Sequence, residues 1–377
     1  MSSFKTLSDI DDVKGKKVLV RSELNTPIEN GKVSDTYRIE KALPTLAWLS
    51  EKGARVIVTA HLGRNPDDSL EPVYEEMKKR FSSAKFVKDL IGEEAKSAID
   101  SLEDGEVLLL ENVRSNPGEK ENDEEFGKAL SSLADYYVDD AFGAAHRKHA
   151  SIVGVPQHIP AFAGLLMERE VNELQKGLSP SAPSVFILGG AKFETKEPLL
   201  EAVVERYDAV FIGGALANDF LKAKGLEVGE SLISEGAENA KALLETNKIV
   251  LPEDVVVEND NGKEIKSVED VLPKDKIVDV GPKSITNLCE SIKDATFIIW
   301  NGPLGYYEGG YIESTQNVAK QISEVNAHSV IGGGDTVAAI RNLELEEKIG
   351  FVSTGGGAML EFLVSGELPG VNVLKSN

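Results

Sequence analysis

The sequence lacks the features of secreted and membrane-spanning proteins. Cys289 is the only cysteine among the 377 residues, so a disulfide within the chain is excluded and a reducing compartment is expected. No apolar run approaches the length of a membrane span, and residues 1–6 show none of the parts of a signal peptide. We therefore expect a cytoplasmic protein that has no membrane partner.

The chain also lacks a net positive charge and two common nucleotide-binding motifs. The chain has 41 basic and 63 acidic residues, a formal net charge of −22, which disfavours binding to nucleic acid. A site for a small anion must then be a local basic cluster. The sequence contains no G-x-x-x-x-G-K-[ST] loop and no complete G-x-G-x-x-G, which disfavours an ordinary P-loop ATPase or a Rossmann dehydrogenase.

Short apolar runs alternate with helical patterns along the whole chain. In the first half these runs lie at 17–21, 54–60, 106–111 and 136–139. In the second half they end in glycine or Asn-Gly and lie at 185–188, 209–212, 297–300, 330–331 and 351–352. This alternation predicts an α/β protein with two doubly wound parallel-sheet (Rossmann-like) domains.

A helical pattern followed by a Pro/Ser segment marks the joint between the halves. Apolar residues recur at helical spacing over 164–177, and the Pro/Ser segment covers 179–184. We predict a first domain at 1–164, a connecting helix at 165–178 and a second domain at 179–357.

Arginines follow the ends of the apolar runs in the first half. Each run is followed at or soon after its end by one arginine, namely Arg21, Arg64, Arg114 and Arg147. Arg38, at the start of a helical pattern, could join them. Ligands of such sheets bind beyond the carboxyl ends of the strands, so these guanidinium groups indicate a site for a small, multiply anionic substrate. His61 and His146 lie nearby and are interpreted as structural hydrogen-bonding residues.

The second half places glycines where the first half places arginines. The stretch 329–337 predicts a strand, a turn of three glycines and a helix N-terminus, with Asp335 at the start of the helix. A carboxylate there would bind phosphate through a divalent cation, which suggests Mg²⁺. Lys192 and Lys196, at the start of another helical pattern, would share one face and offer charges to phosphates. A strand edge with few side chains suits a nucleotide.

Together these segments resemble those of phosphoglycerate kinases, from about residue 17 to residue 371. The resemblance lies in RSELNTP at 21–27, HLGR at 61–64, DAFG with HR at 140–147, LGGAK at 188–192, WNGP at 300–303, GGGDT at 332–336 and STGGG at 353–357. It implies two domains that face each other across a central cleft. The first would bind 3-phosphoglycerate or 1,3-bisphosphoglycerate and the second Mg²⁺ with ATP or ADP, while 358–377 would return to the first domain.

The resemblance also assigns roles to residues. Substrate binding is implied for Glu23, Leu24, Asn25, Arg38, His61, Leu62, Gly63, Arg64, Arg114 and Arg147. Nucleotide binding is implied for Gly189, Lys192, Lys196, Gly213, Gly214, Asn301, Pro303, Glu308, Gly333, Gly334, Asp335 and Thr336. Asp335 would hold the metal, and the catalytic residues would be Arg38, Lys192, Gly334 and Gly357.

The resemblance implies direct in-line transfer of a phosphoryl group between 1,3-bisphosphoglycerate and ADP, to give 3-phosphoglycerate and ATP, after domain closure. It also implies a monomer that acts in glycolysis and gluconeogenesis. Three departures from the family pattern stand out: Ser22-Glu23 replaces Val-Asp, Asp139 replaces asparagine, and the acidic run after Arg114 is short. Two alternatives stay open. The chain could be a non-catalytic paralogue that binds nucleotide or phosphometabolite, or an acyl-phosphate kinase for another acid.

Overall fold

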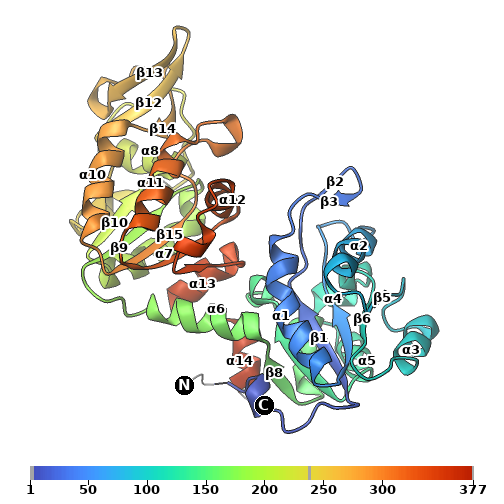
Figure 1. Cartoon of the computed structure of the whole chain (residues 1–377). Helices are drawn as coiled ribbons and strands as arrows, with labels where there is room; N and C mark the ends of the chain where they lie inside the picture. The colour runs from blue at the N-terminus through green and yellow to red at the C-terminus, as the bar shows by residue number, and fades with distance from the viewer. Residues whose placement is uncertain (1–3, 237–238, 376–377) are drawn as a thin grey trace. The chain divides into compact units, whose positions relative to one another are not determined.

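Two compact units make up the chain, each built on its own six-stranded parallel sheet. The computed structural model describes residues 4–236 and 239–375 (Figure 1). Unit 1 comprises the chain up to Asn172 and the segment from Glu367 onward, and unit 2 comprises Glu173–Gly366. The predicted fold class, two doubly wound parallel-sheet domains, is confirmed. Within the described residues no helix is both long and apolar enough to cross a membrane.

The sheet of unit 1 has the order β5-β6-β4-β1-β7-β8, with all neighbours parallel. Its strands are β1 (Lys17–Ser22), β4 (Arg55–Thr59), β5 (Ala84–Phe86), β6 (Val107–Leu109), β7 (Tyr136–Asp140) and β8 (Ala161–Ala163). In β1 the side chains of Val18 and Val20 face one side and Leu19 the other, yet all three are fully buried. Burial of both faces explains why this strand is a continuous apolar run rather than an alternating one.

Helices cover the sheet of unit 1 and leave its carboxyl edge to loops. They are α1 (Tyr37–Glu51), α2 (Glu71–Arg80), α3 (Glu93–Asp100), α4 (Gly118–Glu121) and α5 (Glu124–Ser131), and a two-stranded ribbon of β2 (Ile28–Glu29) and β3 (Lys32–Val33) precedes α1. Ile39, Leu46 and Leu49 of α1 and Met77 of α2 enter one core cluster with the valines of β1 and β4. With Ala42 of α1 and Val73 of α2, which belong to the same cluster, they recur every three to four residues and give each helix one buried face.

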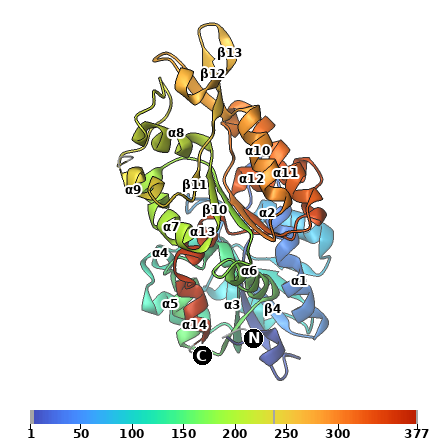
Figure 2. The ribbon, with the colours of Figure 1, turned by 90° about the vertical axis from the view of Figure 1, so that its left-hand side faces the viewer.

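The sheet of unit 2 has the order β11-β10-β9-β15-β16-β17, again fully parallel. The strands are β9 (Ser184–Leu188), β10 (Ala209–Ile212), β11 (Ile249–Val250), β15 (Phe297–Asn301), β16 (His328–Gly332) and β17 (Phe351–Val352). Figure 2 shows α7 (Phe193–Arg206), α8 (Gly214–Ala223) and α9 (Ala240–Leu244) on one side of this sheet, and α10 (Pro282–Lys293), α11 (Glu313–Glu324) and α12 (Gly334–Asn342) on the other.

A small antiparallel sheet is inserted in unit 2, which the sequence reasoning did not predict. It has the order β13-β12-β14 and consists of β12 (Asp254–Asn259), β13 (Gly262–Ser267) and β14 (Lys276–Val280). Gly262, the first residue of β13 after the turn from β12, has φ 103°, a conformation that favours glycine. This sheet supplies one wall of the pocket described below.

The chain passes between the units in α6 and again after α13. Helix α6 runs over Leu165–Lys176, and the division between the units falls within it, after Asn172. Asp140, at the end of β7, accepts hydrogen bonds from the first free backbone N–H groups of α6, at Leu166 (2.9 Å) and Met167 (3.2 Å). Helix α13 (Gly356–Ser365) belongs to unit 2 and packs on α7, and α14 (Pro369–Lys375) belongs to unit 1 and contacts β8. The segment that joins unit 1 thus begins at Glu367, later than the predicted start at 358.

Candidate active site

Arginines of unit 1 converge on His61, which follows β4. Burial lowers the pKa of His61 well below 6.5, and further lowering comes, in decreasing order, from Arg21, Arg114, Arg147 and Arg38. Arg21 also donates a hydrogen bond to His61 Nδ1 (2.9 Å). The imidazole is therefore uncharged at neutral pH, and the positive potential here comes from guanidinium groups.

Arg21 lies inside the sheet, although its sequence position suggested the edge. It is fully buried, and its other hydrogen bonds go to Ser22 O (2.8 Å) and Ser151 Oγ (2.9 Å). Ser151 in turn donates to the buried carboxylate of Glu119 (2.7 Å). Burial raises the pKa of Glu119, but the hydrogen bond from His149, the charge of Arg21 and the Ser151 contacts lower it overall. Arg21 is thus balanced by protein groups and acts as a structural residue.

Hydrogen bonds tie together the loops that follow three neighbouring strands. Asn25, after β1, accepts from Gly63 N at Oδ1 (2.9 Å), and Gly63 O accepts from Arg114, after β6. Arg38, at the start of α1, donates to Asn25 O. The structure therefore brings Asn25, Arg38, His61, Gly63 and Arg114 into one place, as the sequence predicts.

The positive charge in this cluster exceeds the negative charge. The pKa of Arg114 is lowered to about 10, mainly by burial and then by the charges of Arg147 and Arg21. These effects outweigh those of Glu119 and Glu23, which raise the pKa. Arg114 still carries its charge at neutral pH. A cluster whose members disfavour one another's charge is stabilised by binding an anion.

Other predicted substrate residues lie differently. Leu24 and Leu62 are buried members of the core cluster, so only their backbone could meet a ligand. Arg64 and Arg147 are exposed, and Arg147 Nε donates to His146 Nε2 (3.2 Å). Burial and then the charge of Arg147 lower the pKa of His146 to about 4, so this histidine is also neutral.

Buried acids adjoin the arginine cluster, and sequence reasoning singled out only one of them for the site. Glu23 Oε1 lies 3.6 Å from Arg38 Nη1, and Glu23 Oε2 is buried without a hydrogen-bond partner. Asp139, beside Arg21 in the sheet register, has Oδ1 bound to Ala141 N (3.0 Å) and Oδ2 unpartnered. Burial raises the pKa of Asp139 to about 7, and the nearby charge of Glu23 acts in the same direction.

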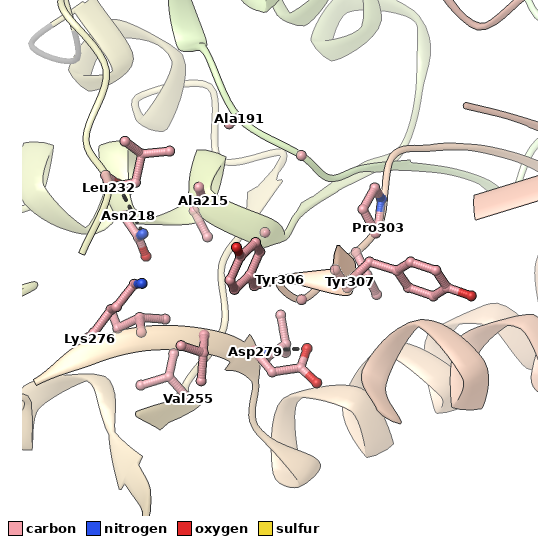
Figure 3. Close-up of a pocket in the computed structure, with 18 of the residues that line it drawn as sticks. Ala191, Ala215, Asn218, Leu232, Val255, Lys276, Asp279, Pro303, Tyr306 and Tyr307 are labelled. Atoms are coloured by element: carbon pink, nitrogen blue, oxygen red, sulfur yellow. Dashed lines mark hydrogen bonds between the residues drawn. The ribbon is translucent and has the colours of Figure 1, made fainter. Parts of the chain in front are cut away.

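Unit 2 contains a pocket of about 620 Å³ at the carboxyl edge of its sheet (Figure 3). One wall is apolar and comes from the inserted sheet, with Val255, Ile277 and Val278. The facing wall is made of the loops after β9, β10 and β15. Figure 3 shows Tyr306 and Pro303 on this loop side and the Lys276 side chain reaching in from β14. The apolar wall suits a flat aromatic group such as a nucleobase, while the lining also includes the charged residues Glu230, Lys276, Asp279, Glu308 and Asp335.

The glycines of these loops let backbone pack on backbone. Gly190 N donates to Pro303 O (3.0 Å), and Gly214 N donates to Leu304 O (2.9 Å). A Cβ on Gly214 would lie 2.6 Å from Gly190 N, so a side chain there would separate the loops. Part of the glycine pattern therefore reflects loop packing and not ligand binding.

Two helix N-termini, by contrast, have glycines that packing does not require. Gly334 begins α12 and Gly357 lies in the first turn of α13, and both are exposed. A Cβ on either would meet no atom within 4 Å. Their N–H groups are among those that an α-helix leaves without an internal partner, which suits an anion.

The two lysines at the start of α7 do not share a helix face, contrary to the prediction. Lys192 precedes the helix with φ 67°, and only Lys196 lies within it. Lys196 Nζ donates to Ala191 O (2.6 Å), and burial lowers its pKa, as does the charge of Lys192. In the part of the chain that the structure describes, neither ammonium group pairs with a carboxylate within 4.0 Å. Both charges are therefore free to meet an anion.

Asp335 fits a role in holding a divalent cation together with phosphates. It lines the pocket half-buried, and burial followed by the charge of Glu308 raises its pKa. No group of three or more acidic, histidine or cysteine side chains that could hold a metal exists among residues 4–236 and 239–375. A single carboxylate is what Mg²⁺ needs when phosphate and water oxygens complete its shell.

Comparison with known proteins identifies the family of the chain. The family model described as phosphoglycerate kinase matches residues 7–366. The chain belongs to the phosphoglycerate kinase family. Relatives named phosphoglycerate kinase include one from Sinorhizobium medicae, 45% identical with 99% of each chain covered, and one from Dictyoglomus turgidum, 44% identical with 98% of this chain and 99% of the relative covered.

Solved phosphoglycerate kinase structures resemble the whole chain. The structure from Coxiella burnetii has a TM-score of 0.86 at 35% identity and covers 99% of each chain. The structure from Pyrococcus horikoshii has a TM-score of 0.90 at 31% identity and covers 98% of each. The family makes the chain a kinase, an enzyme of the transferase class, and disfavours the non-catalytic alternative.

Within this phosphoglycerate kinase fold the predicted nucleotide residues separate into two groups. Those that line the pocket are Gly214, Pro303, Glu308 and Asp335. Those that do not line it are Gly189, Lys192, Lys196, Gly213, Asn301, Gly333, Gly334 and Thr336, of which Gly189, Gly213, Asn301 and Thr336 are buried. Asn301 Nδ2 contacts Met359 Sδ (3.6 Å), whereas Thr336, in the first turn of α12, has a buried Oγ1 without a hydrogen-bond partner.

Several pocket residues were missed by sequence reasoning. They include Asn218 of α8, Leu232, Val255 of β12, Lys276 and Val278 of β14, and Tyr306. None lies in a motif from which the site was predicted, although Tyr306 falls in the glycine-rich loop 302–310, and the strands of the inserted sheet carried no such motif. The apolar run 255–257, followed by Asn261-Gly262, could have indicated a β-hairpin there.

Proposed function

We propose that the chain transfers a phosphoryl group between 1,3-bisphosphoglycerate and ADP to give 3-phosphoglycerate and ATP, with the acid bound by unit 1 and the nucleotide by unit 2. The observation that supports this most strongly is the contrast between the two edges. One gathers guanidinium groups around a neutral His61, and the other offers an apolar pocket of about 620 Å³.

In unit 1 we assign the phosphate and carboxylate of the glycerate to Arg38, Arg114 and Arg147, with Asn25 holding the loops in register. The accepting carboxylate is already ionised near neutral pH, because carboxyl pKa values lie at roughly 4. No general base is then required. The lowered pKa values of His61 and His146 agree with this, because both are best explained as uncharged hydrogen-bonding groups.

In unit 2 we assign the base to the pocket beside Tyr306 and the phosphates to the adjoining helix starts. The N–H groups at Gly334 and Gly357 and the Lys192 ammonium would stabilise charge on the transferring group. Asp335 would hold Mg²⁺, which neutralises phosphate charge when it is bound with the nucleotide.

A coupled assay with 3-phosphoglycerate, Mg²⁺ and ATP tests the proposal. We expect turnover that requires all three, and the reverse reaction with ADP. A folded sample that binds Mg-ATP but turns over only another carboxylic acid would instead support an acyl-phosphate kinase for that acid.

A further inference from the structure

Gly143 faces the carboxylate of Glu23 in unit 1. Gly143 lies in a short 3-10 turn, Phe142–Ala144, that follows β7, and Glu23 follows β1, the strand paired with β7. A Cβ built on Gly143 would lie 2.6 Å from Glu23 Oε2 and 3.1 Å from Cδ. Real Cβ atoms essentially never approach another atom to under 3.0 Å. The glutamate in this position therefore depends on the absence of a side chain at Gly143.

The Glu23 carboxylate has little freedom to move away. Its side chain is 2% exposed, and Oε1 lies 3.6 Å from Arg38 Nη1, close enough for attraction between the charges. The charges of Asp139 and Glu23 disfavour each other, and Asp139 Oδ2 is also buried without a partner. A shift toward Asp139 would bring two unpartnered carboxylate oxygens closer, which is unfavourable.

Glu23 Oε2 also lacks the donor that a buried carboxylate oxygen requires. It is buried and accepts no hydrogen bond in the structure. A buried acceptor without a donor is costly, so unpartnered oxygens of this kind mark places where a ligand or water donates. Because Arg38 lies beside it, the missing donor belongs to the same site that we assign to the glycerate, whose free hydroxyl can supply it.

We propose that Gly143 is a positioning residue for the acid substrate: by lacking a side chain, it lets the long Glu23 side chain hold Oε2 where a substrate hydroxyl donates. This inference rests on the proposed function of unit 1. Gly143 does not have a positive φ, so an alanine there would cause no backbone strain, and its only close contact would be with Glu23.

Steady-state kinetics of the full chain test the proposal. Gly143→Ala should raise KM for 3-phosphoglycerate about tenfold, as expected for a displaced hydrogen bond to a charged group, and leave KM for ATP unchanged. Adding Glu23→Asp to this variant shortens the side chain by one methylene and should recover most of the loss. Gly127→Ala is the matched control, because a Cβ on this buried helical glycine would meet its nearest neighbour at 3.5 Å.

Three outcomes would overturn the inference. KM for 3-phosphoglycerate could stay unchanged in Gly143→Ala, the loss could persist in the double variant, or KM for ATP could rise equally. If Gly143→Ala does not fold, the double variant should fold and turn over, and its failure would contradict the proposed contact. The natural chain is assayed first, so that a lack of turnover with 3-phosphoglycerate counts against the proposed function and not against this inference.

Discussion

The two units present the same kind of sheet edge but equip it in opposite ways. In unit 1 the edge carries several charged side chains, and the hydrogen bonds of Asn25, Arg38 and Arg114 tie its loops together. In unit 2 the loops pack through backbone atoms, and exposed N–H groups stand at the starts of α12 and α13. A parallel sheet thus provides the position of a site, while the residues after its strands decide which ligand it suits.

This difference predicts how each site fails. A site made of side chains loses function when a charge is removed, whereas a site made of backbone loses function when a side chain is added. The predictions that follow test this contrast, from the largest expected effect to the smallest.

Removal of the Arg38 guanidinium should have the largest effect. Arg38→Ala should lower kcat by roughly 10²–10³, the scale seen when a group that stabilises transition-state charge is lost. Steady-state kinetics measure this change, and the matched control is Arg80→Ala, an arginine of the same unit that pairs with Glu40 and Glu76 on the surface. A similar loss in the control, or none in Arg38→Ala, would contradict the assignment.

Lys192 contributes a charged side chain to the site of unit 2, where most of the proposed phosphate donors are backbone N–H groups. The Lys192 ammonium should interact with the transferring phosphoryl group more strongly in the transition state than in the ground state. Lys192→Ala should therefore lower kcat by about 10² and weaken ATP binding by much less. Kinetics and calorimetry with ATP separate the two effects. Equal losses would show that Lys192 only anchors the bound nucleotide.

The buried acid Asp139 should make unit 1 sensitive to pH. Its folded pKa of about 7 lies above the ordinary 3.8, so the native state keeps a proton that the unfolded state releases between these values. The free energy of unfolding should therefore fall as pH rises through this window. Asp139→Asn should reduce the fall between pH 5 and pH 8 by on the order of 2 kcal/mol in urea titrations. The control is Asp104→Asn, a partly exposed residue paired with Arg55, and an unchanged fall in Asp139→Asn would contradict the prediction.

Added methyl groups should have a smaller but more diagnostic effect. Gly334→Ala and Gly357→Ala meet no atom within 4 Å, and alanine is the better helix former, so thermal stability should stay equal or rise. Turnover should nevertheless fall several-fold, because the methyl group keeps phosphate from the helix start. Lower stability with normal turnover would show that these glycines serve packing alone.

Much of this arrangement could be predicted from the sequence, because its signals are local. Buried parallel strands such as β1 are continuous apolar runs, and the residues after them must lie at one edge. The arginines after β4 and β6 and the Gly-Asp pair at the start of α12 could be recognised in this way.

The rest depends on burial and on contacts between distant segments. Arg21 and Arg114 occupy equivalent places after apolar runs, but only the structure shows that Arg21 is bound by Ser151 and His61. Likewise, Lys192 and Lys196 stand at helical spacing, but the left-handed conformation of Lys192 removes it from the helix. Tyr306 and the inserted sheet were missed because they lie outside the motifs from which the site was predicted, although the run 255–257 followed by Asn261-Gly262 indicates a hairpin.

Separate calorimetric titrations of each ligand test the central claim most directly. The full chain, Arg38→Ala and Asp335→Ala are each titrated with 3-phosphoglycerate and, in a second experiment, with Mg-ADP. Arg38→Ala should weaken only the binding of 3-phosphoglycerate, and Asp335→Ala should weaken only the binding of Mg-ADP, each at least tenfold, or about 1.4 kcal/mol. The reverse pattern, or loss of both ligands in either variant, would contradict the assignment of one ligand to each unit.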